Sequence, residues 1–159
     1  MIDVSMAGAS IVLNSKNNLV STRPITEFSD DGTPIDISNL EVASGNMNLN
    51  GLLVTWTKPN PVQVSFTLIP GSDSDRELRK FLAAVHVGGK GESVGEAYIG
   101  SMVYSYPTPN TQTSTSGKNR NTVTFSNGRL LSGPPAIGTS NDGKGASSTW
   151  TFMFESFTN

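Results

Sequence analysis

The sequence contains no cysteine and a single histidine, His86, among its 159 residues. Disulfides, thiolate nucleophiles and histidine-rich zinc sites are therefore excluded, although a metal site built only from carboxylates stays open. Charge is scarce as well. Eleven basic and 13 acidic residues give a formal net charge of -2, which excludes a strongly basic nucleic-acid-binding protein. The chain must fold by packing and strand pairing, and its length suffices for one domain, residues 1–159, with a substantial core.

Hydrophobic runs of the length needed for a secretion signal or a membrane span are also missing. The start Met1-Ile2-Asp3 has no basic residue, and the apolar run Ile11–Leu13 is far too short for either role. We therefore expect a protein that is made in the cytoplasm, is soluble there and has no membrane anchor.

What the sequence does contain is clearest between Val62 and Gly89. Apolar and polar residues alternate over 62–68, which predicts a strand with one buried face, and Pro70-Gly71 ends it. Ser74 and Glu77 have the spacing of a capping box and predict a helix over about residues 74–87. Its apolar stripe comprises Leu78, Phe81, Leu82 and Val85, and Gly88-Gly89 is a typical helix stop.

Most of the remaining sequence has strand patterns, so we expect a mainly β protein with one amphipathic helix. Asn127-Gly128 suits a two-residue turn and predicts a hairpin. The expected strands are Ile11–Leu13, Leu19–Ile25, Leu40–Ala43, Met47–Thr57 with a bulge at Gly51, Ala97–Tyr106, Thr122–Ser126, Arg129–Leu131 and a last strand with Trp150, Phe152 and Phe154 in the core.

Three segments are expected to be flexible loops, near residues 28–39, 107–121 and 138–147. The second is composed almost wholly of Thr, Ser, Asn, Pro and Gly. Such a segment buries too little apolar surface to order itself in an isolated chain.

Several patterns carry possible chemistry, and each has a plainer interpretation. Gly138–Gly145 nearly matches a phosphate-binding loop, but Gly145 replaces the required hydroxyl and a strand follows instead of a helix. The acidic residues between Asp73 and Glu77 lack the glycine of a calcium loop and suit the first turn of a helix. His86 has no nucleophile-elbow motif to serve and is better explained as a helix-end residue. We therefore predict a protein that is not an enzyme and assign no catalytic, cofactor-binding or metal-binding residues.

Tyr98, Tyr104 and Tyr106 leave one alternative open. Flat amphipathic rings stack on sugars, so a carbohydrate-binding module is the second reading, whereas strand alternation also makes these tyrosines ordinary core or interface residues. We expect Met102 to share their side of the strand.

The order of these elements resembles that of tail tube proteins of contractile-tailed bacteriophages (myovirus-type tail tube). The resemblance covers most of the chain. The phrases that carry it are Phe28-Ser-Asp-Asp-Gly-Thr-Pro, Asn48-Leu-Asn-Gly-Leu-Leu-Val-Thr-Trp-Thr, the Val62–Pro70 strand, the helix beginning Ser74-Asp75, Asn127-Gly-Arg, Ser132-Gly-Pro-Pro-Ala and Trp150–Glu155.

The resemblance implies an antiparallel β-sandwich or partial barrel with one flanking helix. It also implies a virion protein that self-assembles into stacked hexameric rings, forming the hollow tube through which the genome passes on sheath contraction. Expected partners are other copies, the tail sheath, the tape measure and the baseplate, with DNA passing without specific binding and with no cofactor. A tail-terminator or baseplate-proximal ring that does not stack is an alternative with the same fold.

Overall fold

The computed structural model describes residues 8–15, 23–30, 33–86, 98–107 and 120–159. The elements are β1 (Ser10–Ser15), β2 (Ile35–Ile37), β3 (Ala43–Met47), β4 (Leu53–Thr57), β5 (Val62–Leu68), α1 (Asp73–Val85), β6 (Tyr98–Pro107), β7 (Arg120–Ser132) and β8 (Ser148–Thr158). Among these residues α1 is the only helix, and its 13 residues are too few and too polar to cross a membrane.

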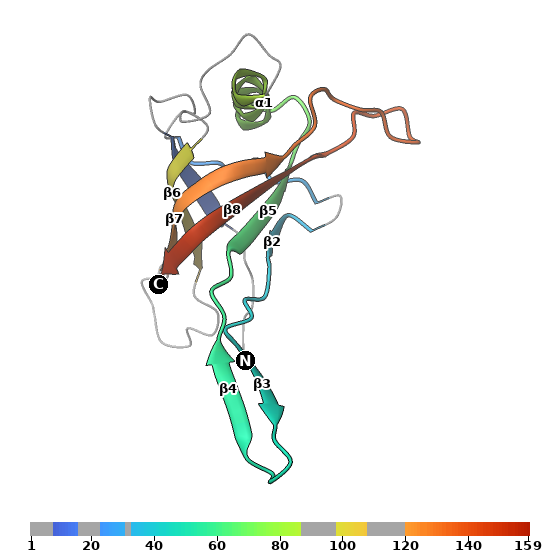
Figure 1. Cartoon of the computed structure of the whole chain (residues 1–159). Coiled ribbons are helices and arrows are strands. Elements are labelled where there is room, and N and C mark those ends of the chain that lie inside the picture. The colour runs from blue at the N-terminus through green and yellow to red at the C-terminus, as the bar shows by residue number, and fades with distance from the viewer. Residues whose placement is uncertain (1–7, 16–22, 31–32, 87–97, 108–119) are drawn as a thin grey trace, which may run out of the picture.

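Six strands form one antiparallel sheet in the order β1-β6-β7-β8-β5-β2. The sheet is curled into a partial barrel, and α1 lies across one end of it (Figure 1). The strands β3 and β4 pair only with each other and project from the opposite end. The expected mainly β, antiparallel fold with one flanking helix is therefore confirmed.

The core lies inside the curl, where the alternating apolar residues of each strand meet. Trp150, Phe152 and Phe154 are buried, as expected, together with the apolar residues of β5. Phe66 and Phe152 stack with ring centroids 5.6 Å apart, and Phe125 lies 5.5 Å from Phe154. Aromatic pairs across neighbouring strands add to the stability of a sheet.

Helix α1 begins slightly before the predicted start and uses a different cap. Ser72, not Ser74, is the N-cap residue, and its hydroxyl accepts a hydrogen bond from the Asp75 amide at 3.3 Å. Ser72 is the cap because the chain turns at Pro70-Gly71, directly before it. Gly71 has a φ of +78°, which suits glycine. Leu78 and Phe81 are buried as predicted, whereas Leu82 and Val85 pack at the margin of the core. The predicted stop at Gly88-Gly89 lies outside the described residues.

The hairpin predicted at Asn127-Gly128 is wrong, because β7 runs straight through it. Ser126 pairs with Ser101 and Gly128 with Ile99, so both flanks stay on the same neighbour, β6. Asn127 has a φ of +55°, which marks a local irregularity within the strand. A β-carbon at Gly128 would lie 2.2 Å from the Phe154 ring, so glycine is required there to admit that ring.

The strand at 97–106 differs from its predicted pattern at its start. Gly100 interrupts the alternation, so that Ile99 enters the core and Tyr98 is half exposed. Beyond this point Met102 and Tyr104 are buried as expected, and Tyr106 packs at the core margin against Tyr104.

Two further expectations differ from the structure. The single strand predicted over Met47–Thr57 is divided by a turn, and Gly51 belongs to this turn and not to a bulge. The segment expected as a loop over 28–39 carries the short strand β2. Most of the strand predicted at Leu19–Ile25 lies outside the described residues, and its last residue, Ile25, forms a single bridge with Ile11. Most of the loop predicted over 107–121 also lies outside the described residues.

Candidate assembly surface

The most exposed apolar part of the structure is the two-stranded ribbon β3–β4, which we call the arm (residues 43–57). Its register pairs Ala43 with Thr57 at the base and Met47 with Leu53 near the tip. Asn48 organises the turn, because its side-chain carbonyl accepts hydrogen bonds from the amides of Asn50 and Leu52 at 3.0 and 2.8 Å. Gly51 completes the turn with a φ of +78°.

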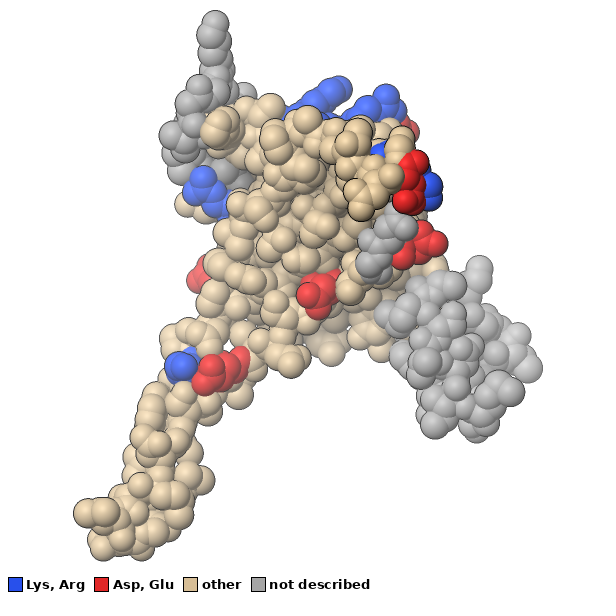
Figure 2. Space-filling view, turned by 90° about the vertical axis from the view of Figure 1, so that its right-hand side faces the viewer, with Lys and Arg blue, Asp and Glu red and all other residues tan. Residues whose placement is uncertain are grey.

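The arm exposes large apolar side chains and carries no charge. Residues 42–57 contain no Asp, Glu, Lys or Arg. Met47 is 64% exposed, Leu53 68% and Trp56 49%. The arm stands out in Figure 2 as an uncharged projection. An apolar surface of this kind marks an interaction site, because soluble monomers rarely expose contiguous apolar patches.

A small polar cluster fixes the base of the arm. The Glu41 carboxylate accepts hydrogen bonds from Lys58 at 3.3 Å and from the Ser44 hydroxyl at 3.1 Å. The hydrogen bond from Lys58 is the largest cause that lowers the pKa of Glu41, and the hydrogen bond from Ser44 is the next largest. The Asn60 side chain donates to the Glu41 carbonyl at 2.8 Å, and the Lys58 amide donates to the Val42 carbonyl. The direction of the arm is therefore set by side chains as well as by the backbone.

A second feature is the seam between the two edge strands of the curled sheet, β1 and β2. Residues 25–29 close one end of this seam. Ile25 exchanges backbone hydrogen bonds with Ile11 beside β1, and Ser29 donates to the Thr67 carbonyl on β5 at 2.9 Å. The described residues show no such bridge at the other end.

Beside this closing segment, which contributes Thr26 and Phe28 to the lining, the seam holds an apolar slot of about 430 Å³. None of its lining residues is charged; they include Ala9, Thr26, Phe28, Pro34, Ile35 and Tyr104. Burial, with the neighbouring Tyr106 as a smaller cause, raises the pKa of Tyr104. Ile35 is also part of the edge strand β2, so the slot and an open backbone edge lie together.

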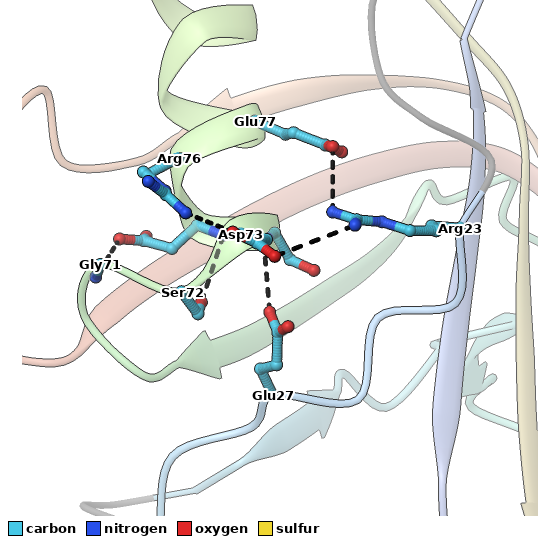
Figure 3. Close-up of polar contacts among 9 residues, drawn as sticks. Arg23, Glu27, Gly71, Ser72, Asp73, Arg76 and Glu77 are labelled. Carbon is cyan, nitrogen blue, oxygen red and sulfur yellow. Dashed lines mark hydrogen bonds and ion pairs between the residues drawn. The ribbon is translucent and has the colours of Figure 1, made fainter.

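The third feature is the charged outer side of α1, shown in Figure 3. Arg23 forms ion pairs with Glu77 at 3.1 Å and with Asp73 at 3.9 Å, and Arg76 pairs with Asp73. Glu27 accepts a hydrogen bond from the Ser74 amide at 3.2 Å. These charges neutralise one another and tie residues 23–27 to the helix.

Beneath this surface, Asp75 connects α1 to the sheet. Asp75 is fully buried, and its carboxylate accepts hydrogen bonds from the Trp150 indole at 3.2 Å and from the Gly71 amide at 3.1 Å. Arg79 pairs with it at 2.9 Å and also donates to Ser148 on β8 at 3.2 Å. This carboxylate is therefore a buried structural link between α1 and the sheet.

The residues that the sequence singled out for possible chemistry do not lie together in one site. His86 is exposed at the C-terminal end of α1. Residues 138–146 form a tight turn in which the Ser140 amide donates to the Lys144 carbonyl and the Ala146 amide to the Gly138 carbonyl. Among the described residues, no three Asp, Glu or His side chains lie close enough together to hold a metal ion.

The sequence interpretation missed the arm as an exposed surface and Asp75 as a buried link. The uncharged stretch 42–57 was a usable signal for the first, because alternating apolar residues without any charge are unusual on a solvated ribbon. No sequence signal identifies the partner of Asp75, since Trp150 lies 75 positions away.

Comparison with solved structures finds the same fold in parts of contractile injection systems. The sheath/tube terminator of an extracellular contractile injection system (PVC), in its extended state, aligns with a TM-score of 0.53 at 12% identity, covering 98% of this chain and 94% of that one. The tube-terminating cap of the anti-feeding prophage aligns with a TM-score of 0.51 at 14% identity, covering 94% of this chain and 85% of that one. Identities this low establish the shared fold alone.

Comparison with curated proteins gives no match to this sequence. The family described as tail fiber protein gp32, by contrast, matches residues 2–158, nearly the whole chain. The family match concerns a tail protein, which agrees with the expectation of a structural protein related to contractile tails. The chain belongs to the tail fiber protein gp32 family.

Proposed function

We propose that this protein is a structural component of a contractile phage tail that assembles into a single ring and terminates the tail tube. The observation that carries the proposal is the uncharged, exposed arm on a small curled sheet with open edges. Such a chain leaves much apolar surface and many backbone groups unsatisfied as a monomer, and a ring of copies covers both.

The terminating role is favoured over stacked tube rings by the fold comparison. Two proteins with this fold are named as a tube terminator and a tube-terminating cap, and the alignment extends over almost the entire length of each. In a terminating ring, one face binds the last ring of the tube, and the opposite face binds no further tube ring. We infer six copies, if the ring continues a hexameric tube.

In this proposal the charged outer side of α1 faces a sheath subunit, the tape measure and baseplate are more distant partners, and DNA passes through the ring without specific binding. The net charge of -2 is compatible with such passage, because a strongly basic channel would bind phosphates. The function is mechanical and requires no cofactor.

Negative-stain electron microscopy of the purified chain over a concentration series tests the proposal. We expect hollow rings of constant diameter that do not grow into tubes at high concentration. A second sample contains tail tubes of the same phage with gold-labelled chain, and the label is expected at one end of each tube. Long tubes formed by the chain alone would support the stacked-ring function instead, and labelled chain that never binds tube ends would refute the terminating role.

The carbohydrate-binding alternative has weaker support in the structure. Among the described tyrosines, Tyr104 is buried and stacks on Tyr106 with ring centroids 4.9 Å apart, and Tyr98 lies apart from them beyond Gly100. The exposed Trp56 lies opposite Ser44 on the uncharged arm, where no carboxylate or other charged group is available to fix the orientation of a sugar.

A further inference from the structure

The arm needs a partner to be stable in its observed form. A two-stranded ribbon without a third strand or a packed face is marginal in water. Its five-pair ladder is held at the base by Glu41 and Lys58, but Met47 and Leu53 near the tip have no core beneath them. Something uncharged and apolar must therefore cover the tip in the assembled state.

The seam slot has the complementary properties. It is uncharged and lined by apolar or small side chains, including Phe28, Ile35 and Tyr104. Its volume of about 430 Å³ suits one or two large aliphatic side chains. An apolar tip in an uncharged slot leaves no buried charge unpaired on either side.

The backbone beside the slot offers a strand-pairing edge. The Ser38 amide donates to the Gln63 carbonyl at 3.1 Å and the Thr67 amide donates to the Pro34 carbonyl at 2.9 Å. Alternate residues of an antiparallel strand face the same neighbour, so the peptide groups of Ile35 and Ile37 point away from β5. The described residues place no further strand on that side of β2.

The arm of the same molecule does not reach this slot. The arm lies between β2 and β5 in the chain and projects away from the sheet (Figure 1). Its ladder of five residues spans about 17 Å, all of it directed outward. An arm can therefore reach such a slot only on another molecule.

We propose that the tip of the arm of one copy inserts into the seam slot of a second copy and pairs with the outer edge of β2 there. The contact joins two different surfaces, so each copy has one arm to give and one slot to fill. Repetition of such a contact generates a closed ring when the rotation between copies closes. This inference rests on the proposed ring and specifies the contact that holds it together.

A complementation experiment with two variants tests this contact. Leu53→Asp places a charge on an exposed arm position and leaves the slot intact. Ile37→Pro removes an outward amide from the edge of β2 and leaves the arm intact, and proline is tolerated at such an edge position. Leu131→Asp is the matched control, because Leu131 is a 46% exposed leucine on β7, away from both surfaces. Mass is measured by sedimentation velocity, and folding by circular dichroism.

Each of the two variants alone is expected to self-associate at least tenfold more weakly than the wild type, while Leu131→Asp assembles normally. An equimolar mixture of the two variants is expected to give 1:1 dimers, because one intact arm and one intact slot remain. Rings formed by either variant alone, or a mixture that contains only monomers, would overturn the proposed contact.

A second measurement covers the case in which Ile37→Pro does not fold. The natural chain has no cysteine, so Leu53→Cys and Ile37→Cys in one chain form intermolecular disulfides only if the arm meets β2. Oxidation is expected to yield a ladder of covalent oligomers on a denaturing gel. Wild-type rings without this ladder would refute the contact and leave the ring intact. A wild-type protein that stays monomeric at every concentration would refute docking between copies. The proposed function is tested separately, by whether the labelled chain binds to tube ends.

Discussion

Among the described residues, Asp75 is the only charged side chain that is buried, and both of its carboxylate oxygens accept hydrogen bonds. Its carboxylate connects the first turn of α1 to Trp150 and holds Arg79 against β8. The Nε atom of Arg79 is buried without a hydrogen-bond partner, so this arginine depends on Asp75 and Ser148 for its polar contacts. The helix is thus fixed to the sheet by a polar link inside the apolar contact.

Asp75→Ala is expected to destabilise the protein by about 3–5 kcal/mol, because it leaves the Arg79 charge without its partner. Urea unfolding followed by circular dichroism measures this loss. Asp73→Ala, in the same turn, is the matched control and removes the two exposed ion pairs with Arg23 and Arg76, with an expected cost of about 1 kcal/mol or less. Equal losses in the two variants would contradict the role assigned to Asp75.

Tyr104 makes the free energy of unfolding depend on pH in the alkaline range. Burial favours its neutral form and raises its pKa, so the folded state holds the phenolic proton more tightly than the unfolded state does. The resulting stability is fully present below the ordinary tyrosine pKa of about 10 and is lost as pH rises above it through the pKa of the folded protein.

Tyr104→Phe is therefore expected to lessen the fall in melting temperature between about pH 9 and pH 11, since phenylalanine has no proton to lose. Thermal unfolding at intervals across that window gives the slope for each protein. Tyr98→Phe, at a half-exposed position, is expected to leave the slope of the wild type unchanged. A slope identical in all three proteins would show that Tyr104 does not titrate with unfolding.

At the scale of elements, the close pairing of β7 with β8 depends on the absence of a side chain at Gly128. A β-carbon there would lie 2.2 Å from the Phe154 ring and 2.7 Å from the Met153 carbonyl oxygen. Both neighbours belong to β8 and pair with β7 directly, so neither can withdraw without disturbing the ladder.

Gly128→Ala is expected to cost about 1–3 kcal/mol through overpacking against Phe154. Gly100→Ala is the control within the neighbouring strand, because its added carbon would lie 3.4 Å from the nearest atom, an ordinary contact. Denaturant unfolding of both variants provides the comparison. A smaller loss at Gly128 than at Gly100 would mean that β7 shifts to accept the methyl group.

The sequence predicted the elements whose signal is local. Val62–Leu68, Trp150–Phe154 and the buried stripe of α1 follow from periodicity alone, because each element buries one face. Asn127-Gly128 gave a wrong prediction, because the same dipeptide suits both a hairpin turn and an irregularity within a strand. The close approach of the Phe154 ring to Gly128 favours the second, and a local pattern does not show it. The arm was predicted as strand, but its exposure depends on where the sheet ends. The slot is formed by segments that meet only in the folded chain, and no local pattern indicates it.

At the scale of the whole molecule, the surfaces proposed for assembly are apolar and uncharged. Ring formation is therefore expected to change less than about threefold between about 0.05 and 0.5 M sodium chloride, because screening acts only on charges. Cooling is expected to weaken it, since the hydrophobic contribution falls at low temperature. Sedimentation equilibrium across both series measures the association constant. A tenfold loss in high salt would assign the contact to the charged side of α1 instead.

The course of the chain through the arm also determines how force enters the fold. Strand β4 leads through Lys58–Pro61 into β5, which lies between β8 and β2 and supplies four of the buried core residues. A pull on an arm held by a neighbour is thus a pull along β5. Seven residue pairs join β5 to β8, and they bear such a load together, in shear, rather than opening one after another. The arm is consequently a mechanical tether anchored in the most deeply buried strand.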